Sequence, residues 1–319
     1  MIDFIEATKC LCKDSPFLGH CKQFSSRLNE FGWETYTIQG CKELEVHWHP
    51  EGRLLRLKGS LPYWWQGHNF IFPNKDFVDA VEVLQNLLGV GLWDAVVDEF
   101  EFGCIFQVEG KPSDFIRNHN PIPKAHLFSN ERGRDKQGFR WWENSVKSLK
   151  LYDAGKNIKM KQGLKEREVI EKCGYNPEKS YLKFEVHFKK AHLLDGGKGV
   201  KLESLQNPVF LQYLRRTLEN EYHQLQPMRT LLQPTTKKDL MALDAVVQVY
   251  VEEMMNQGIP VEVAKKKIYS FINQQGVLSK QDKDSRKATI RKAFGKLQES
   301  PDSQWDLSQK IEEALEVEV

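Results

Sequence analysis

The sequence lacks long hydrophobic runs, a secretory signal and a disulfide framework. It contains no stretch of about 18 apolar residues, the length that a membrane-spanning helix requires. The N-terminal residues Met-Ile-Asp-Phe-Ile-Glu include no basic segment followed by apolar residues, so we expect no signal peptide. The six cysteines do not follow a disulfide spacing that would be typical of a chain of 319 residues. These absences predict a cytoplasmic protein with free thiols and no membrane partner.

The sequence also lacks a phosphate-binding loop of the form Gly-x4-Gly-Lys-Ser/Thr. We therefore expect no nucleotide cofactor. Internal repeats and low-complexity tracts are absent as well. Apolar residues make up 40% of the chain, which is enough to bury a core. The length predicts one large domain or two smaller ones, at roughly 150 residues per domain.

Charge is balanced overall but uneven along the chain. The net charge is +2, yet residues 131–165 contain ten Lys or Arg against four Asp or Glu. From residue 301 to the end there are one Lys and six acids. A basic middle and an acidic tail are compatible with nucleic-acid binding, although many neutral enzymes have the same unevenness.

The pattern of apolar residues predicts a mixed architecture. Period-two alternation or apolar enrichment predicts strands at residues 44–49, 55–58, 100–108, 146–151 and 181–189. Helical spacing predicts helices at residues 77–88, 208–225, 238–257, 261–274, 286–298 and 307–319, the first capped by Asp76 and ended by Gly89. Residues 110–145 are expected to be a long loop region. The fold class is therefore α/β (α+β), with a central, mostly antiparallel sheet and flanking helices over residues 1–200 and a helical region over residues 201–319.

Tyr152 is the first candidate for chemistry. It ends the segment Leu149-Lys-Leu-Tyr152, in which Leu149 and Leu151 are expected to face the core and Lys150 and Tyr152 the opposite side. A tyrosine can act as a covalent nucleophile, and nearby lysines favour the phenolate and bind phosphate. On the residues alone, an ordinary surface tyrosine explains the same pattern.

Several acids and histidines share strand faces and are candidate metal ligands. Carboxylates, sometimes with imidazole, hold the Mg²⁺ or Mn²⁺ that phosphoryl chemistry commonly uses. Solvent-facing acids and hydrogen-bonded histidines would give the same pattern. The candidates are Glu101, Glu185 and His187, the pair His47 and His49, and His68 in a turn-like Gly-His-Asn stretch.

Aromatic and basic side chains provide a candidate DNA-binding surface. Aromatic rings stack on unpaired bases, and lysine and arginine follow a phosphate backbone. Core packing and a solvated helix face are the alternatives. The candidates are Arg140, Trp141, Trp142, Lys147, Lys159, Lys161, Arg291 and Lys292.

The order of these segments resembles the gene II and gene X type replication initiators of filamentous phages. The similar features are the start Met1-Ile-Asp3, the segment Leu57-Lys-Gly-Ser-Leu-Pro-Tyr-Trp-Trp-Gln-Gly-His-Asn69, the acid in Phe100-Glu101-Phe102, the strand ending in Tyr152 with Lys156 after it, and the strand Leu182-Lys-Phe-Glu185-Val. Order and approximate spacing hold from residue 1 to about residue 210.

The resemblance implies a rolling-circle initiator with a fold like that of the HUH endonucleases. By this resemblance, Tyr152 is the nucleophile that nicks and rejoins one origin strand. Lys150 and Lys156 assist it, and Glu101, Glu185 and His68 lie near a divalent metal, Mg²⁺ or Mn²⁺. The implied partners are single-stranded or locally melted origin DNA, the replication helicase and polymerase of a bacterial host, and a second copy of the chain.

Three departures from the family pattern keep other interpretations open. Glu99 stands where the family usually has a basic residue, Asp153-Ala-Gly separates Tyr152 from Lys156, and His47-Trp-His49 is not a fixed feature of the family. Both His47 with His49 and His68 remain candidate ligands. Two alternative functions are a non-catalytic DNA-binding protein, such as a decayed initiator or repressor of a phage or plasmid, and a plasmid mobilisation relaxase.

Overall fold

The chain forms two compact units. The computed structural model describes residues 1–12, 24–28, 32–38, 43–120, 126–129, 139–161, 169–195, 199–227, 242–256, 259, 261–297 and 306–317. Unit 1 comprises Met1–Arg117, Pro121–Leu225 and Leu307–Val319, and unit 2 comprises Asn118–Asn120 and Gln226–Asp306. Residue 200, the boundary expected from sequence, lies inside unit 1, because β12 pairs with the sheet there and the following helix packs on it.

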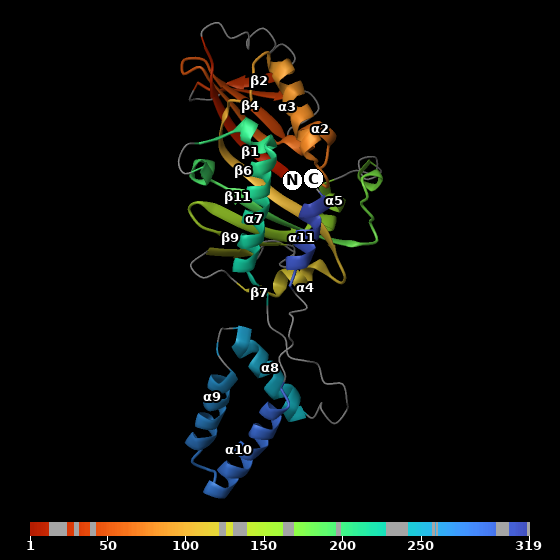
Figure 1. The fold of residues 1–319 in the computed structure, drawn as a ribbon. Coiled ribbons are helices and arrows are strands. Elements are labelled where there is room, and N and C mark those ends of the chain that lie inside the picture. Colours follow the sequence, from red (N-terminus) through yellow and green to blue (C-terminus); the bar gives the residue numbers. More distant parts are fainter. Residues whose placement is uncertain are drawn as a thin grey trace. The chain divides into compact units, whose positions relative to one another are not determined.

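Unit 1 is built on one large antiparallel sheet (Figure 1). Its order is β2-β3-β4-β5-β1-β6-β11-β10-β9-β8, and β12 pairs with β6 beside this path. The strands are β1 (Ile2–Cys10), β2 (Phe24–Leu28), β3 (Glu34–Ile38), β4 (Leu44–His49), β5 (Leu54–Ser60), β6 (Val96–Val108), β8 (His126–Ser129), β9 (Phe139–Glu143), β10 (Lys147–Asp153), β11 (Ser180–Phe188) and β12 (Val200–Lys201). The predicted class, a mixed fold with a mostly antiparallel sheet and flanking helices, is confirmed.

One face of the sheet carries the main core, and three helices pack on it: α3 (Asn74–Leu88), α7 (Pro208–Gln224) and α11 (Ser308–Val317). Alternation along the central strands explains this face, because Leu149, Leu151, Phe184 and Val186 are all buried. Helix α3 begins at Asn74 after Pro73, so Asp76 lies in its first turn and does not cap it, while Gly89 ends it in the left-handed conformation as expected.

Helices α7 and α11 are joined to each other as well as to the sheet. Asn207 caps α7 by accepting hydrogen bonds from Val209 and Phe210, and Pro208 occupies the first turn. The Tyr222 ring of α7 contacts Phe184 of β11 at 5.5 Å between ring centroids. The Tyr222 hydroxyl accepts a hydrogen bond of 2.7 Å from the backbone N–H of Leu307, immediately before α11. Residues 307–317 are thereby held on unit 1.

The described residues cover the opposite face of the sheet only in part. A smaller core lies there under α5 (Ala154–Lys161), and it is formed by Phe70, Ala154, Ile158, Ile170, Tyr175 and Tyr181. The short helix α2 (Leu61–Gln66) follows β5 directly and packs on β1. Beyond the smaller core this face carries charged side chains, and the candidate site lies at the border between the two.

The region 110–145, expected to be mostly loop, contains regular structure. Helix α4 (Pro112–Arg117) packs on β9 and β10, and β8 and β9 extend the sheet beyond β10. Trp142 of β9 is 1% exposed and packs on the core face. Burial of this aromatic strand against β10 outweighs the polar, Pro- and Gly-rich composition around it. Residues 121–125 and 130–138 are outside the described part of the chain.

In its described residues, unit 2 contains three helices and a short two-stranded pairing. The helices are α8 (Ala242–Asn256), α9 (Val261–Gln274) and α10 (Lys280–Gly295), and the strands are β7 (His119–Asn120) and β13 (Gln226–Pro227). Its core is formed by Val247, Val251, Ala293 and Phe294. Helix α10 begins six residues before the position expected from sequence, because Ser279 and Asp282 form a capping box there.

No helix in the described part of the chain is both long enough and apolar enough to cross a membrane.

Replacing Ile311 by Ala tests the packing of α11 on unit 1. Ile311 is 1% exposed, so the substitution should lower the free energy of unfolding by about 2–5 kcal/mol through lost burial and a cavity. The matched control is Lys310→Ala, whose side chain is 48% exposed and should change stability by no more than about 0.5 kcal/mol. Urea denaturation followed by tryptophan fluorescence measures both. Equal, small effects would contradict the packing of α11 on unit 1.

Candidate functional site

Five charged residues from four adjacent strands form a cluster on the partly open face, here called the carboxylate–lysine cluster: Asp3, Glu101, Lys150, Lys183 and Glu185. Strand register explains their proximity. Lys150 of β10 is paired with Glu185 of β11, and Tyr152 is paired with Lys183. Strand β6 lies on the other side of β11, and its Glu101 is paired with His187. Because His187 is two residues from Glu185 and shares its face, Glu101 also points to this face.

A register shift brings Asp3 into the cluster. The pairing of β1 with β6 passes from Ile2 opposite Phe102 to Ile5 opposite Phe100, so β1 contains one extra residue. In a regular strand Asp3 and Phe4 would point to opposite faces, but both line the same pocket here. A β-bulge of this kind re-aims a side chain, and in this chain it re-aims Asp3.

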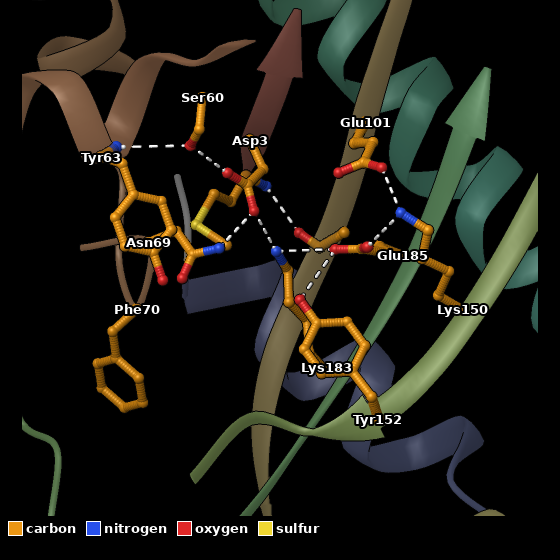
Figure 2. Close-up of polar contacts among 12 residues, drawn as sticks. Asp3, Ser60, Tyr63, Asn69, Phe70, Glu101, Lys150, Tyr152, Lys183 and Glu185 are labelled. Carbon is orange, nitrogen blue, oxygen red and sulfur yellow. Dashed lines mark hydrogen bonds and ion pairs between the residues drawn. The ribbon is translucent and has the colours of Figure 1, made fainter. Parts of the chain in front are cut away.

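The five charges are connected by direct ion pairs (Figure 2). The Lys183 ammonium lies 2.5 Å from Asp3 Oδ2 and 2.8 Å from Glu185 Oε2. The Lys150 ammonium lies 2.5 Å from Glu101 Oε1 and 3.3 Å from Glu185 Oε1. Glu185 is therefore shared by both lysines, and the two ammonium groups alternate with the three carboxylates.

Polar neighbours fix the orientation of the Asp3 carboxylate and of the Tyr152 hydroxyl. The Ser60 hydroxyl donates a hydrogen bond of 2.6 Å to Asp3 Oδ1, and the Asn69 amide donates to Asp3 Oδ2. The Tyr152 hydroxyl donates to Glu185 Oε2 at 3.3 Å, and the Lys183 ammonium lies 5.8 Å from the centroid of the Tyr152 ring. The tyrosine hydroxyl thus points at the cluster.

The cluster borders a pocket of about 510 Å³. Its walls come from β1, β4, β5, β6, β10, β11, α2 and α5. The described residues that line it are Asp3, Phe4, Glu43, Glu45, Lys58, Gly59, Ser60, Tyr63, Asn69, Glu101, Lys150, Tyr152, Asn157 and Glu185. The five acids outnumber the two lysines, so the pocket would attract a cation more readily than a bare phosphate.

Burial and ion pairing act in opposite directions on the three carboxylates. Burial would raise the pKa of Asp3 and of Glu185, but nearby ammonium groups, Lys183 above all, hold both pKa values below their ordinary range. For Glu101, burial and the charge of Glu185 outweigh the effect of Lys150 and raise the pKa to about 7. Asp3 and Glu185 are therefore ionised at neutral pH, and Glu101 is near its midpoint.

The tyrosine and the two lysines keep their protons. Burial and the Glu185 carboxylate raise the pKa of Tyr152 well above its ordinary value, although Lys183 partly opposes them. Burial would lower the pKa of Lys183, but Asp3 and Glu185 raise it well above the ordinary value, and Glu185 and Glu101 raise the pKa of Lys150 in the same way. A base or a cation must act on Tyr152 before it becomes a phenolate.

The acids have the donor type that Mg²⁺ and Mn²⁺ prefer. Asp3, Glu101 and Glu185 each offer a carboxylate oxygen within 4.8 Å of the others. Gly103, which faces Glu185 across the strand pair, leaves room for the cluster, since a Cβ there would lie 2.5 Å from Glu185 Cβ and 2.5 Å from Phe184 O. The two ammonium groups already occupy positions between these oxygens, so the donor set accepts positive charge.

Of the four candidate histidines, only His187 adjoins the cluster. Its Nδ1 lies 3.4 Å from Glu101 Oε1 and its Nε2 lies 3.0 Å from Glu99 Oε2. His68 is buried beside the smaller core, 3.9 Å from the Cys173 sulfur, and burial lowers its pKa, so the ring is neutral. Asn69, the next residue, contacts Asp3.

His47 and His49 serve local contacts on β4. His47 Nδ1 is hydrogen-bonded to the Thr35 hydroxyl at 3.0 Å, and its Nε2 lies 3.2 Å from Glu45. His49 Nδ1 accepts a hydrogen bond of 2.9 Å from the Gly52 N–H in the turn after β4. Among the described residues, these two histidines are not part of the group of acids that could hold a metal.

The basic and aromatic candidates on β9 and β10 fall on both faces of the sheet. Trp141 faces the cluster, with the Lys150 ammonium 5.9 Å from its ring centroid. Trp142 is buried in the core, and Arg140 is paired with Leu151 and shares its face. Lys147 forms an ion pair with Glu221 of α7. Trp141 is thus the one of these four that borders the site.

The remaining candidates lie outside the pocket wall. Lys156 is in the first turn of α5, where its N–H donates to Asp153 Oδ1 at 2.8 Å. The Lys159 ammonium donates to the carbonyl of Pro177 at 3.1 Å. Lys161 ends α5, and its side chain is outside the described part of the chain. Arg291 and Lys292 are exposed on α10 of unit 2.

Two charged members of the cluster were not singled out from the sequence. Asp3 enters the sequence analysis only as part of the family-like N-terminal segment. Its place in the cluster depends on the bulge in β1, which cannot be recognised from the sequence alone. Lys183 was placed on the face shared by Glu185, but the alternation makes it a solvent-facing residue, whereas it is 1% exposed. The sequence carries no signal for this burial, because Lys183 follows the same alternation as Glu185 and His187.

Replacing Gly103 by Ala tests the close approach of β6 and β11 at the cluster. The new Cβ would overlap with Glu185 and with the backbone of Phe184, so we expect a loss of about 1–3 kcal/mol in the free energy of unfolding. The matched control is Gly91→Ala, where the nearest atom would lie 3.9 Å away. Thermal unfolding followed by circular dichroism compares them. A Gly103→Ala variant as stable as the control would refute the crowding.

Glu101 should make stability depend on pH. Its pKa is raised from 4.5 to about 7, so its stabilising contribution is complete below about pH 4.5 and is lost as the pH rises through 7. Between pH 5 and 8 the wild type should lose about 1–3 kcal/mol more of its free energy of unfolding than Glu101→Gln does. Urea titrations at several pH values measure this difference. Parallel curves for the two proteins would contradict the raised pKa.

Comparison with known proteins gives no family to which this site can be related. No protein-family model matches the chain, and no curated protein matches it. The chemistry of the carboxylate–lysine cluster is therefore inferred from its own geometry.

Proposed function

We propose that this chain is a tyrosine endonuclease and strand transferase that nicks single-stranded or locally melted DNA and rejoins it, as a rolling-circle initiator does. One observation supports this most. Glu101, Tyr152 and Glu185, which the resemblance to phage initiators implied separately, line a single pocket together with Lys150. They come from three strands and span 85 residues of sequence, counted from 101 to 185.

The architecture supports the same proposal. A tyrosine at the end of one strand faces acids on the neighbouring strands of an antiparallel sheet. The antiparallel sheet, with helices packed on one face and the reacting face partly open, is compatible with an HUH-like endonuclease, although the His-x-His pair of β4 makes local contacts and is not part of the acidic group. The cytoplasm of a bacterial host, with its helicase and polymerase, would be the setting of such an enzyme.

In the proposed reaction the Tyr152 oxygen forms a bond to phosphorus while the bond from phosphorus to the 3′ oxygen breaks. Glu185, 3.3 Å from the Tyr152 hydroxyl, accepts the phenolic proton. The Lys150 ammonium, two residues away on the same strand face, donates a proton to the departing 3′ oxygen. The products are a 5′ phosphotyrosine and a free 3′ hydroxyl, and attack by a 3′ hydroxyl reverses the step without a nucleotide cofactor.

A divalent metal, Mg²⁺ or Mn²⁺, would polarise the scissile phosphate and stabilise charge on its oxygens. Glu101 and Glu185 would hold it, with His187 beside Glu101. Lys183 and Asp3 keep Glu185 oriented, since the Lys183 ammonium bridges their carboxylates. The acidic lining of the pocket supports a role for a cation, because DNA phosphate would otherwise meet an excess of negative charge.

A label-transfer assay tests the nucleophile. With Mn²⁺ and a randomised single-stranded DNA library labelled at the 3′ end, the label should become covalently attached to the protein, whereas a 5′ label should not. Tyr152→Phe should reduce this adduct at least about a thousandfold, because the nucleophile is gone. The control is Tyr213→Phe on α7, an exposed tyrosine outside the pocket that should form the adduct normally.

The other outcomes separate the alternatives. An adduct that survives Tyr152→Phe but disappears in Tyr63→Phe would move the nucleophile to the other tyrosine of the pocket. DNA binding without any adduct in the wild type would reject the enzyme and favour a non-catalytic DNA-binding protein.

A further inference from the structure

Two ammonium groups already occupy the gaps between the three carboxylates of the cluster. Lys183 lies between Asp3 and Glu185, and Lys150 lies between Glu101 and Glu185 (Figure 2). A divalent cation that binds these acids therefore has to compete with a lysine. The two lysines differ in how firmly they are held, and this difference decides which one can leave.

Lys183 is a fixed part of the protein interior. It is 1% exposed and does not line the pocket. Its partner Asp3 is held by Ser60 and Asn69, so the pair cannot separate without breaking further hydrogen bonds. An ammonium removed from both carboxylates at this depth would be a buried, unpaired charge, which costs several kcal/mol. Lys183 therefore stays in place in any loaded state.

Lys150 has an exit. Its side chain is 25% exposed, it lines the pocket, and its ammonium reaches Glu101 and Glu185 from the pocket side. The ammonium lies 2.5 Å and 3.3 Å from the two carboxylate oxygens, whereas Mg²⁺ binds oxygen at about 2.1 Å. A metal ion and the ammonium cannot occupy this gap together, both because of their size and because of their like charge.

The charge balance favours exchange over addition. With all groups ionised, three carboxylates and two ammonium groups sum to a charge of −1. A divalent ion that replaces the Lys150 ammonium leaves the three carboxylates with Lys183 and the metal, a sum of zero. Addition without exchange would leave a net positive charge in a largely buried site. Exchange thus gives the neutral arrangement.

We infer that Lys150 is the internal counter-ion of a single divalent-cation position between Glu101 and Glu185, and that metal binding displaces its ammonium toward the substrate phosphate. This rests on the proposed function. Lys150 and Tyr152 are two residues apart on one strand face, so the released ammonium stays beside the atom that attacks. Asp3 is then the partner of Lys183 and not a metal ligand, which leaves one metal position.

Metal affinity measured without DNA tests this exchange. The full chain is titrated with Mn²⁺ at pH 8, and free Mn²⁺ is followed by electron paramagnetic resonance. Lys150→Met keeps the apolar stem but removes the competing charge, so it should bind Mn²⁺ about tenfold more tightly than the wild type does, equivalent to about 1.4 kcal/mol. Lys150→Arg keeps a competing cation and should show no gain in affinity.

A matched control separates direct competition between Lys150 and the metal from the general electrostatic effect of a lysine charge in the pocket. Lys58 also lines the pocket, but its ammonium contacts Glu6 at 2.7 Å. Lys58→Met removes the same charge, and it should change Mn²⁺ affinity less than about threefold. Circular dichroism and thermal unfolding establish that each variant is folded before titration.

The outcomes distinguish the inference from the function on which it rests. Weaker or unchanged Mn²⁺ binding in Lys150→Met overturns the exchange, even if the wild type forms the Tyr152 adduct. An equal gain in Lys150→Met and Lys58→Met also overturns it. If no variant binds Mn²⁺ and the adduct forms in the presence of a chelator, the exchange and the metal fail while the tyrosine mechanism stands. Tighter binding in Lys150→Met alone supports the exchange, whether or not an adduct is found.

Discussion

A buried lysine organises the candidate site. The Lys183 ammonium is almost entirely removed from solvent, and such a charge is tolerated only with ionised partners in direct contact. Asp3 and Glu185 supply them, so the position of both carboxylates is dictated by Lys183. Asp3 in turn requires the bulge in β1 and the hydrogen bonds from Ser60 and Asn69. The direction of the Tyr152 hydroxyl follows, because it donates to Glu185.

Much of unit 1 could be predicted from the alternation of apolar and polar residues. Burial of Leu149 and Leu151 against the helices turns Lys150 and Tyr152 to the other face, as period two requires. The same alternation in β11 places Glu185 and His187 beside them. That the strands 100–108, 146–151 and 181–189 are neighbours was not evident from their separate patterns, and pairing is what brings Glu101 to Tyr152.

The features that sequence missed depend on long-range packing or on local irregularity. A register shift of one residue decides whether Asp3 faces the core or the pocket. The periodicity of apolar residues does not reveal this shift. Residues 110–145 look like a loop because polar and turn-forming residues dominate, yet Trp142 is covered by neighbouring elements and holds β9 in the sheet. The histidines of β4 matched a metal-binding pattern, but they lie beside Thr35, Glu45 and a turn.

The larger part of unit 2, Gln226–Asp306, is inserted into unit 1, since the chain leaves after Leu225 and returns at Leu307 to form α11. Both ends of the insertion are anchored, because α7 packs on β6 and β11, α11 packs on β6 and α7, and Tyr222 is hydrogen-bonded to Leu307. A single backbone cut within Gln226–Asp306 would therefore produce two fragments that stay associated through α11. Such a nicked chain would migrate as one particle under native conditions and as two polypeptides after denaturation.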